Sequence, residues 1–495
     1  MTIGSVMQYL LLTGLFVFLT SEPGFAGATG SSPPAITEQV LYKFCPQVGC
    51  TDGTNPEGGV IMDASGNLYG TTYYGGSHNG GTVFKLAPSG TGWAETVLYN
   101  FCAQTNCIDG YSPAVGLIMD GSGNLYGTTN SGGSHGGGGT VFKLAPSGTG
   151  WTETVLYSFC AQINCPDGLF PQGRLILDGS GNLYGTANAG GGSQDQGVVY
   201  RLAPSGTGWV ESVLYSFCAQ GGSACTDGAY PDGGLIMDGS GSLYGTTNQG
   251  GTGRGTVYKI TPVSQGWAHT VLYNFCSQTN CADGAYPVAE LIMDAAGNLY
   301  GTTLFGGSGG SSGVVFRLAP SGTGWIEAVL YNFCSQNGCA DGAEPYAGLI
   351  MDGAGHLYGT TYYGGNYNCG YNNASACGTV LQLSGIINTL SVSIVGNPGG
   401  RVVSSPAAIN CGSTCSASFP WGTQVTLSAT PASAWGLAGW SGACSGIGNC
   451  TVTMNANASV SATFTTLFSG PGVPQLDPTL PPAVISPLPV APTAF

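Results

Sequence analysis

Residues 116–129 read GLIMDGSGNLYGTT, residues 139–144 read GTVFKL, and residues 153–159 read ETVLYSF. This stretch holds four short runs of β-branched, aromatic and aliphatic residues, separated by Gly-rich turn signals. It therefore predicts four antiparallel strands, which we call a, b, c and d in chain order. The expected bounds are residues 116–120, 124–129, 139–144 and 153–159.

The same unit recurs along the chain with a period of about 58 residues, which indicates a repeat architecture. Four antiparallel strands in each of several units are typical of the blades of a β-propeller. A β-solenoid is the alternative, but its coils are usually far shorter. The Leu-Tyr-Gly signature of strand b is centred on Tyr69, Tyr126, Tyr184, Tyr244, Tyr300 and Tyr358.

The two ends of the repeat region predict how the ring closes. Six a-b-c sets are present, and the last one ends near Leu383 without a strand d after it. One additional d-like strand stands at residues 38–44, before the first set. Pairing of these two strands would remove exposed sheet edges. We expect an all-β fold: a six-bladed propeller at residues 36–384, closed by the N-terminal strand, plus a small C-terminal β domain.

Charges on strands c and d are expected to fix the register. A cation recurs on strand c, and an acid follows ten residues later on strand d, so the two face each other across a turn centred on Gly90. Such cross-strand pairs contribute roughly 0.2–1 kcal/mol each, which makes them structural groups. The pairs are Lys85–Glu95, Lys143–Glu153, Arg201–Glu211 and Arg317–Glu327, with Lys259 facing His269 in the fourth unit.

Composition excludes several classes of function. Only 9 Lys and Arg stand against 24 Asp and Glu, giving a formal net charge of −15. Phosphate backbones and anionic lipids are bound by clustered cations. We therefore expect no nucleic-acid partner and no electrostatic docking on membranes.

Residues 1–28 are expected to form a signal peptide. An apolar run at residues 9–19 precedes the small residues 26–28, although no Lys or Arg stands before it. A buried strand or short helix is the alternative. No other stretch could span a bilayer. We expect a secreted or cell-surface monomer without a transmembrane segment in the mature chain.

The 18 cysteines fall into nine local pairs, which predicts disulfides formed in an oxidising compartment. Zinc is the alternative, but the spacing is not CxxC and the chain has only 4 His. We expect no metal and no cofactor. The predicted pairs are Cys45–Cys50, Cys102–Cys107, Cys160–Cys165, Cys218–Cys225, Cys276–Cys281, Cys334–Cys339, Cys369–Cys377, Cys411–Cys415 and Cys444–Cys450.

The repeat strings, from DGSGNLYGTT to VLYSF, resemble the GloVer tandem repeat of bacterial surface proteins. The resemblance covers roughly residues 36–384 and implies an exported surface protein, but it carries no established activity or catalytic residues. Residues 388–466, with GNPGGRV at 396–402 and GWSGAC at 439–444, look like the divergent internalin-type B-repeat. Residues 467–495 are Pro-rich and expected to be an extended, disordered tail without an anchoring motif.

One face of the expected disc is a candidate binding surface. The b–c and d–a loops vary among the repeats, and varied loops on a rigid scaffold are where binding usually resides. We expect this face to bind an extracellular glycan or protein, or to serve as a scaffold, without catalysis. The candidate contacts are Tyr73, Tyr74, His78, His135, Tyr362 and Tyr363, with packing of the loops as the alternative role of the tyrosines.

Three sharper interpretations concern acids and histidines. One Asp in each Cys-x-Asp-Gly turn could bind Ca²⁺ as a ring, but capping of the turn explains these residues more simply. His78 and His135 could share a metal, but no third ligand is evident. A polysaccharide-acting hydrolase or lyase remains the alternative function, with Glu57, Glu290 and Glu344 as its nonrepeating acids on the variable face.

Overall fold

The computed structural model describes residues 41–467, apart from residues 46–48, 91, 193, 221, 309–311, 323, 353–354, 366–377, 397–398, 413–414, 421 and 455–456. The predicted signal peptide, the Cys369–Cys377 pair and residues 468–495 of the predicted tail lie outside the described residues. In the described part, no helix has the length and apolarity needed to cross a membrane.

The repeat region is built from four-stranded antiparallel sheets, as the sequence predicts. Five sheets have the order a-b-c-d, and the sixth has three strands. Strands a are β1 (Ile61–Met62), β5 (Ile118–Met119), β10 (Ile176–Leu177), β14 (Ile236–Met237), β18 (Ile292–Met293) and β22 (Ile350–Met351). Strands b are β2 (Leu68–Thr72), β6 (Leu125–Thr129), β11 (Leu183–Ala189), β15 (Leu243–Thr247), β19 (Leu299–Thr303) and β23 (Leu357–Thr360).

Strands c and d of the first five repeats have 8 or 9 residues and are longer than the strands a and b. Strands c are β3 (Thr82–Ser89), β7 (Thr140–Ser147), β12 (Val198–Ser205), β16 (Thr256–Val263), β20 (Val314–Ser321) and β24 (Val380–Leu383). Strands d are β4 (Gly92–Asn100), β8 (Gly150–Ser158), β13 (Gly208–Ser216), β17 (Gly266–Asn274) and β21 (Gly324–Asn332). The short strand β9 (Leu169–Pro171) also pairs with β11.

Single 3-10 turns lie inside four of the disulfide loops. They are η1 (Thr105–Cys107), η2 (Gly222–Ala224), η3 (Thr279–Cys281) and η4 (Asn337–Cys339). Eight of the nine predicted disulfides are present, and the described residues include no free cysteine.

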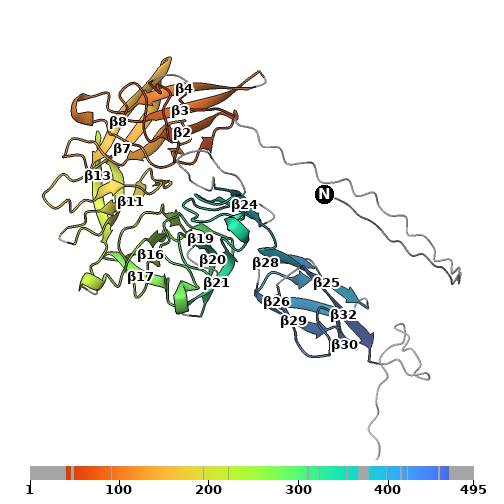
Figure 1. The fold of residues 1–495 in the computed structure, drawn as a ribbon. Coiled ribbons are helices and arrows are strands. Elements are labelled where there is room, and N and C mark those ends of the chain that lie inside the picture. Colours follow the sequence, from red (N-terminus) through yellow and green to blue (C-terminus); the bar gives the residue numbers. More distant parts are fainter. Residues whose placement is uncertain are drawn as a thin grey trace, which may run out of the picture. The chain divides into compact units, whose positions relative to one another are not determined.

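Consecutive sheets pack face to face, and the core lies between them. Phe101, just after β4, packs edge-to-face on Phe142 of β7 in the next sheet, with ring centroids 5.0 Å apart. Both side chains are fully buried, and burial of such a side chain stabilises the fold by roughly 1.5–3 kcal/mol. The same contact recurs as Phe159–Tyr200, Phe217–Tyr258 and Phe275–Phe316. Figure 1 shows these sheets following one another in chain order, from red through green.

The sixth sheet differs from the prediction. In the described part of the chain, β24 pairs only with β23, and residues 41–44 form no strand, while residues 38–40 are outside the described part. β24 has 4 residues where the other c strands have 8, so it offers a shorter edge. Phe44 nevertheless packs on Phe84 with ring centroids 4.8 Å apart, as the equivalent Phe residues do between the other sheets.

Residues 387–466 form two further four-stranded sheets around their own core. The orders are β28-β25-β32-β30 and β27-β26-β29-β31, and β25 runs parallel to β32. The buried core includes Leu390, Val425, Leu427 and Trp440. The strands are β25 (Ile387–Val395), β26 (Gly400–Ser405), β27 (Asn410–Cys411), β28 (Ser416–Pro420), β29 (Gln424–Pro431), β30 (Trp435–Gly442), β31 (Cys450–Thr453) and β32 (Ala458–Thr466).

Candidate functional site

A cavity of about 480 Å³ is lined by residues from all six repeats. Its lining comes from the segments that lead into the strands a. These are residues 57–61, 114–116, 172 and 174, 232–234, 288–290 with 292, and 346–350. Segments of all six repeats therefore meet at one shared cavity.

Small residues allow the lining segments of neighbouring repeats to approach closely. A Cβ added to Gly58 would lie 2.7 Å from the carbonyl carbon of Val115 in the next repeat. A Cβ on Gly233 would lie 2.7 Å from the carbonyl oxygen of Ala289. Threonines of strand b join the same segments: Thr246 Oγ1 donates to the Ala289 carbonyl at 3.1 Å. At these positions the backbones of neighbouring repeats are thus in direct contact.

Two charges of opposite sign stand where other repeats have Gly. Arg174 and Glu290 occupy the same position of the third and fifth repeats, on either side of Gly234. A Cβ on Gly234 would lie 3.3 Å from both the Arg174 Cβ and the Glu290 Cδ. Burial raises the pKa of Glu290, and the Arg174 charge opposes that shift. Without a Cβ on Gly234, there is room for both side chains.

Asp232 is held rigidly at this cavity. Its carboxylate accepts hydrogen bonds from the Asn188 Nδ2 and, at 2.8 Å, from the Asn248 Nδ2. Burial raises the pKa of Asp232, and the two amide donors act against that shift. Asn188 lies near the end of β11 and Asn248 directly follows β15, so Asp232 connects the ends of strands b of two neighbouring repeats.

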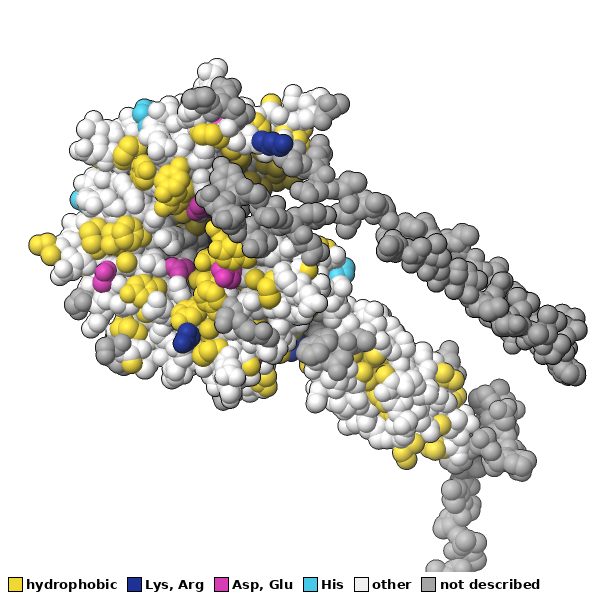
Figure 2. Space-filling model, viewed as in Figure 1, with side chains coloured by type: hydrophobic (Ala, Val, Ile, Leu, Met, Phe, Trp, Pro, Cys, Tyr) yellow, Lys and Arg dark blue, Asp and Glu magenta, His cyan; other side chains and the backbone are white. Residues whose placement is uncertain are grey.

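Amides and tyrosines surround the same opening. Asn130 Nδ2 donates to the Tyr73 hydroxyl at 3.3 Å, and Gln172 Nε2 donates to Asn130 Oδ1 at 3.4 Å. Tyr346 lines the cavity and packs edge-to-face on Tyr362, with ring centroids 5.6 Å apart. We call the following residues the rim: Tyr346, Tyr362, Asp232, Asn188 and Asn248. Figure 2 shows acidic side chains near the middle of the repeat region, among mostly uncharged neighbours.

The predicted tyrosines lie in two edge-to-face pairs. Tyr73 packs on Tyr74 at 4.5 Å, and Tyr362 packs on Tyr363 at 4.7 Å between ring centroids. Tyr362 is 62% exposed, which leaves its ring accessible to a ligand. Tyr73 directly follows β2 and contacts Asn130 of the next repeat, and Tyr362 stands two residues after β23 and contacts Tyr346 of its own repeat.

The two predicted histidines lie elsewhere. His78 Nδ1 is 3.0 Å from the Ser77 hydroxyl, and His135 Nδ1 is 3.1 Å from that of Ser134. Neither lines the shared cavity. His135 lines a separate hollow together with Glu153 of β8 and the 3-10 loop before it. The described residues hold no group of three or more His, Cys, Asp or Glu that could bind a metal.

Sequence reasoning did not select Asp232, Asn188, Asn248, Gln172 and Tyr346 as contacts. A signal for three of them was present, because the residue after the Pro of each d–a loop differs among repeats. It is Glu57, Ala114, Gln172, Asp232, Val288 or Tyr346. Comparison of equivalent positions would have found these residues, whereas a search for aromatic pairs does not.

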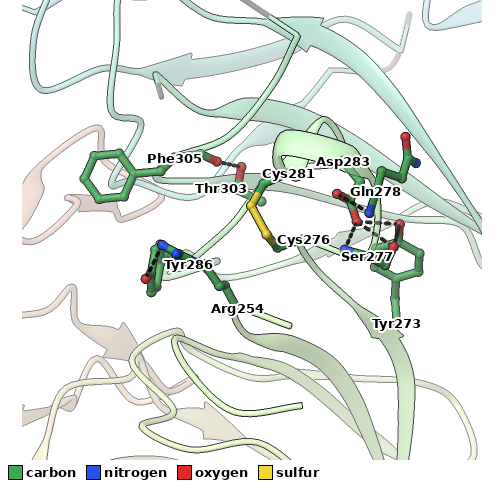
Figure 3. Close-up of a disulfide and its surroundings, with 10 residues drawn as sticks. All are labelled: Arg254, Tyr273, Cys276, Ser277, Gln278, Cys281, Asp283, Tyr286, Thr303 and Phe305. Atoms are coloured by element: carbon green, nitrogen blue, oxygen red, sulfur yellow. Dashed lines mark hydrogen bonds between the residues drawn. A yellow bond between two sulfur atoms is a disulfide. The ribbon is translucent and has the colours of Figure 1, made fainter. Parts of the chain in front are cut away.

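The Asp of each Cys-x-Asp-Gly turn is used within its own disulfide loop. Asp283 accepts hydrogen bonds from the backbone N–H groups of Ser277 and Gln278 and from the Tyr273 hydroxyl, at 2.9, 3.3 and 2.9 Å (Figure 3). Asp109, Asp227 and Asp341 repeat this pattern. These acids cap the loops, as expected from turn chemistry.

The predicted cross-strand charge pairs are wrong by one residue. The hairpin pairs Ser89 with Gly92, so Lys85 faces Thr96 and Glu95 faces Leu86. The turn therefore has two central residues and is not centred on Gly90. Because neighbouring residues of a strand point to opposite faces, the two charges lie on different sides of the sheet. The same register holds for Lys143–Glu153, Arg201–Glu211 and Arg317–Glu327.

The two sets of charges have separate environments. Lys85 lies over the Tyr69 ring at 5.7 Å, and Lys259 approaches Asp238 at 3.7 Å. The strand-d acids face the gap between sheets, where one carboxylate oxygen of each is buried without a hydrogen-bond partner among the described residues. Burial raises the pKa of these acids to about 7 or 8, with the nearby loop Asp adding to the shift. They are Glu95, Glu153, Glu211 and Glu327.

A family model for the Gloeobacter/Verrucomicrobia repeat matches residues 27–252 and 223–385. A model for the divergent InlB B-repeat domain matches residues 391–467. Both resemblances expected from the sequence are confirmed. No curated protein matches the chain.

Solved structures that match part of this chain include two dehydrogenases. A putative glucose dehydrogenase from Thermus thermophilus is 16% identical, with 66% of this chain and 97% of that chain covered and a TM-score of 0.39. A PQQ-bound aldose sugar dehydrogenase from Streptomyces coelicolor is 13% identical, with 67% and 95% covered and a TM-score of 0.39. PorZ, a surface component of the type-IX secretion system of Porphyromonas gingivalis, is 15% identical, with 74% and 46% covered and a TM-score of 0.33. At these scores no activity is carried over to this chain.

Proposed function

The chain belongs to the Gloeobacter/Verrucomicrobia repeat family, and from this premise we propose that it is an exported module that binds an extracellular glycan. The binding site is the shared cavity and its rim. One observation carries the proposal: residues from six repeats, otherwise similar in sequence, place different polar and aromatic side chains around one cavity of about 480 Å³.

The chemistry of the rim suits a hydroxyl-rich ligand. Asp232 supplies acceptor oxygens, and the side-chain amides of Asn188 and Asn248 supply both donors and acceptors. Tyr346 and Tyr362 supply aromatic surface beside them. Ligand sites usually combine such surfaces with a few fixed polar groups. Because Asp232 is already held by two amides, little ordering of side chains would oppose binding.

A closed ring of six blades is part of the proposal. The Phe44–Phe84 contact supports it, because it places Phe44 where Phe101, Phe159 and the later equivalents stand between sheets. The strand predicted at residues 38–44 would then complete the sheet of β24. Closure of the ring would keep the cavity walls in place, while the sequences of the b–c and d–a loops could differ among repeats.

Export also belongs to the proposal. Eight local disulfides among the described cysteines are consistent with an oxidising compartment, outside the cytosol. We propose that the mature chain is secreted or held at the cell surface as a monomer. Analytical ultracentrifugation of the secreted protein tests the monomer, and N-terminal sequencing tests removal of residues 1–28.

The binding experiment starts with a glycan array of the purified mature chain. For the best neutral saccharide, calorimetry should show at least tenfold weaker binding by Asp232→Asn and by Tyr362→Ala. Asp195→Asn is the matched control, because Asp195 lies in a b–c loop outside the cavity and Asn can still accept the Gly190 N–H. Equal affinities for all variants would place the ligand elsewhere and reject this site.

A polysaccharide-cleaving activity is the second candidate. Glu57 and Glu290 line the same cavity as Asp232, and burial raises the pKa of all three acids, as suits a general acid. Glu344 does not line it. Release of reducing ends from an array-positive polysaccharide, lost in Glu290→Gln, would establish catalysis. Binding without such release would leave the module as a binding protein.

A further inference from the structure

A second pocket, of about 540 Å³, adjoins the rim. It lies between the fourth and fifth repeats and is lined by Asn248, Arg254, Asn280, Tyr286, Leu304 and Phe305, together with the Cys276–Cys281 loop at Cys281. Asn248 belongs to both places, since its amide also donates to Asp232. A ligand that extends from the rim therefore enters this pocket next.

Arg254 supplies the positive charge among the residues that line this pocket. It is the only Lys or Arg in any of the six b–c loops of a chain with net charge −15. Its side chain is exposed, and within the described residues no carboxylate lies within ion-pair distance of it. A guanidinium group has five N–H donors, of which one is directed to the Tyr286 hydroxyl at 2.8 Å.

The guanidinium is held in place by its neighbours. The Arg254 N–H donates to the Phe275 carbonyl and the Arg254 carbonyl accepts the Tyr286 N–H, both at 2.9 Å. The guanidinium carbon lies 5.5 Å from the centre of the Tyr286 ring. Figure 3 shows Arg254 and Tyr286 joined by their hydrogen bond, with Phe305 nearby and the disulfide beside them. The cation is thus oriented before any ligand arrives.

Two aromatic walls complete the pocket. Tyr286 and Phe305 pack edge-to-face, with ring centroids 5.9 Å apart and planes at 89°. Their perpendicular rings offer apolar surface for the face of a sugar ring, while the remaining guanidinium N–H groups fit the two oxygens of a carboxylate. A single cation in a strongly acidic protein favours a singly charged group over a phosphate.

We propose that this pocket binds the carboxylate-bearing ring of a uronic acid within an acidic glycan. The inference rests on the proposed function, because it extends the rim through Asn248. Arg254 would select the acidic residue, and the rim would hold the neighbouring sugar. Saccharides whose carboxylate is esterified would lose the contact with Arg254.

The test is calorimetric titration of the full mature chain with trigalacturonate, its methyl ester and N-acetylglycine. We expect trigalacturonate to bind, and to bind at least tenfold more weakly to Arg254→Gln. The methyl ester should bind equally weakly to both proteins. Arg401→Gln is the matched control, because it removes one cation from the C-terminal domain, where Arg401 bonds Asn410. Thermal unfolding of both variants should match that of the parent chain.

Three results would overturn the proposal. The first is no binding of trigalacturonate, and the second is equal binding of trigalacturonate by the parent chain and by Arg254→Gln. The third is binding of N-acetylglycine as tightly as trigalacturonate, which would indicate a site for carboxylates in general. Failure of the proposed function is separate: it appears as unchanged binding of neutral saccharides by Asp232→Asn. Arg254→Gln should leave that neutral binding unaltered.

Discussion

The half-buried acid of strand d predicts that the protein loses stability as the pH rises. Glu153 in β8 has one carboxylate oxygen buried without a hydrogen-bond partner among the described residues. Burial, with a smaller contribution from the Asp109 charge, raises its pKa to about 8. Glu153→Gln keeps the shape of the side chain and removes the ionisation.

The magnitude follows from the difference in pKa between the folded and unfolded chains. The pKa shift from 4.5 to about 8 corresponds to a loss of unfolding free energy of at most roughly 5 kcal/mol, at 1.4 kcal/mol per pKa unit. The carboxyl group is still partly in water, so we take about 2 kcal/mol. Below pH 4.5 the acid is protonated in both states and folding loses nothing. Between pH 4.5 and 8 the unfolded chain releases the proton first, so stability falls.

Thermal unfolding by calorimetry at pH 5 and pH 8.5 measures this loss. For a body of roughly 350 residues, 2 kcal/mol corresponds to about 3 °C in Tm. Glu153→Gln should unfold within about 1 °C of the parent chain at pH 5 and about 3 °C above it at pH 8.5. An equal difference in Tm at the two pH values would refute the reasoning.

The fourth repeat offers a control of opposite sign. His269 occupies the same position, stacked on Tyr215 with ring centroids 4.3 Å apart. Burial lowers its pKa from 6.5 to about 4, with the Asp227 charge acting against the shift. Here the unfolded chain takes up a proton first as the pH falls from 6.5 to 4. His269→Gln should therefore gain stability relative to the parent chain at pH 4.5 and show no gain at pH 8.5.

Three further predictions concern the scaffold. Gly127→Ala should lower the unfolding free energy by about 1–3 kcal/mol, because its Cβ would lie 2.7 Å from the Phe142 ring, whereas Gly121→Ala, with nothing within 4 Å, should be neutral in the same denaturant titration. Replacing both Cys276 and Cys281 by Ser should lower the unfolding free energy by about 2 kcal/mol, measured as a lower denaturation midpoint. Reductant should then no longer act on this loop. Lys143→Gln should cost less than about 1 kcal/mol, because it removes only the contact with the Tyr126 ring, and a larger loss would show that this cation does more than pack.

Most of the sheet architecture could be predicted from the sequence, because it is repeated. Four strands per unit, the Gly-rich turns and the local cysteine pairs each appear several times, so one unit can be checked against the next. The pairing register between strands c and d was harder to predict from the sequence. A hairpin with two central residues shifts the pairing by one position relative to a turn centred on Gly90, and that shift separates Lys85 from Glu95.

The sequence indicated the loops around the cavity but not the residues that meet there, and binding at this face stays a prediction. Variation among the b–c and d–a loops pointed to this face, and Tyr362 does lie beside cavity-lining Tyr346. The contact between Asp232 and Asn188 joins residues of different repeats, and such convergence depends on how the sheets are placed around the cavity. His135 was selected because it stands in one of the varied b–c loops, but it lies outside the shared cavity.

A crystal structure of the mature chain with its best array-selected saccharide tests the central claim most directly. The account predicts electron density for the saccharide at the cavity, within hydrogen-bond distance of Asp232 and against the Tyr346 or Tyr362 ring. A saccharide bound instead at the a–b turns, or on residues 387–466, would contradict it.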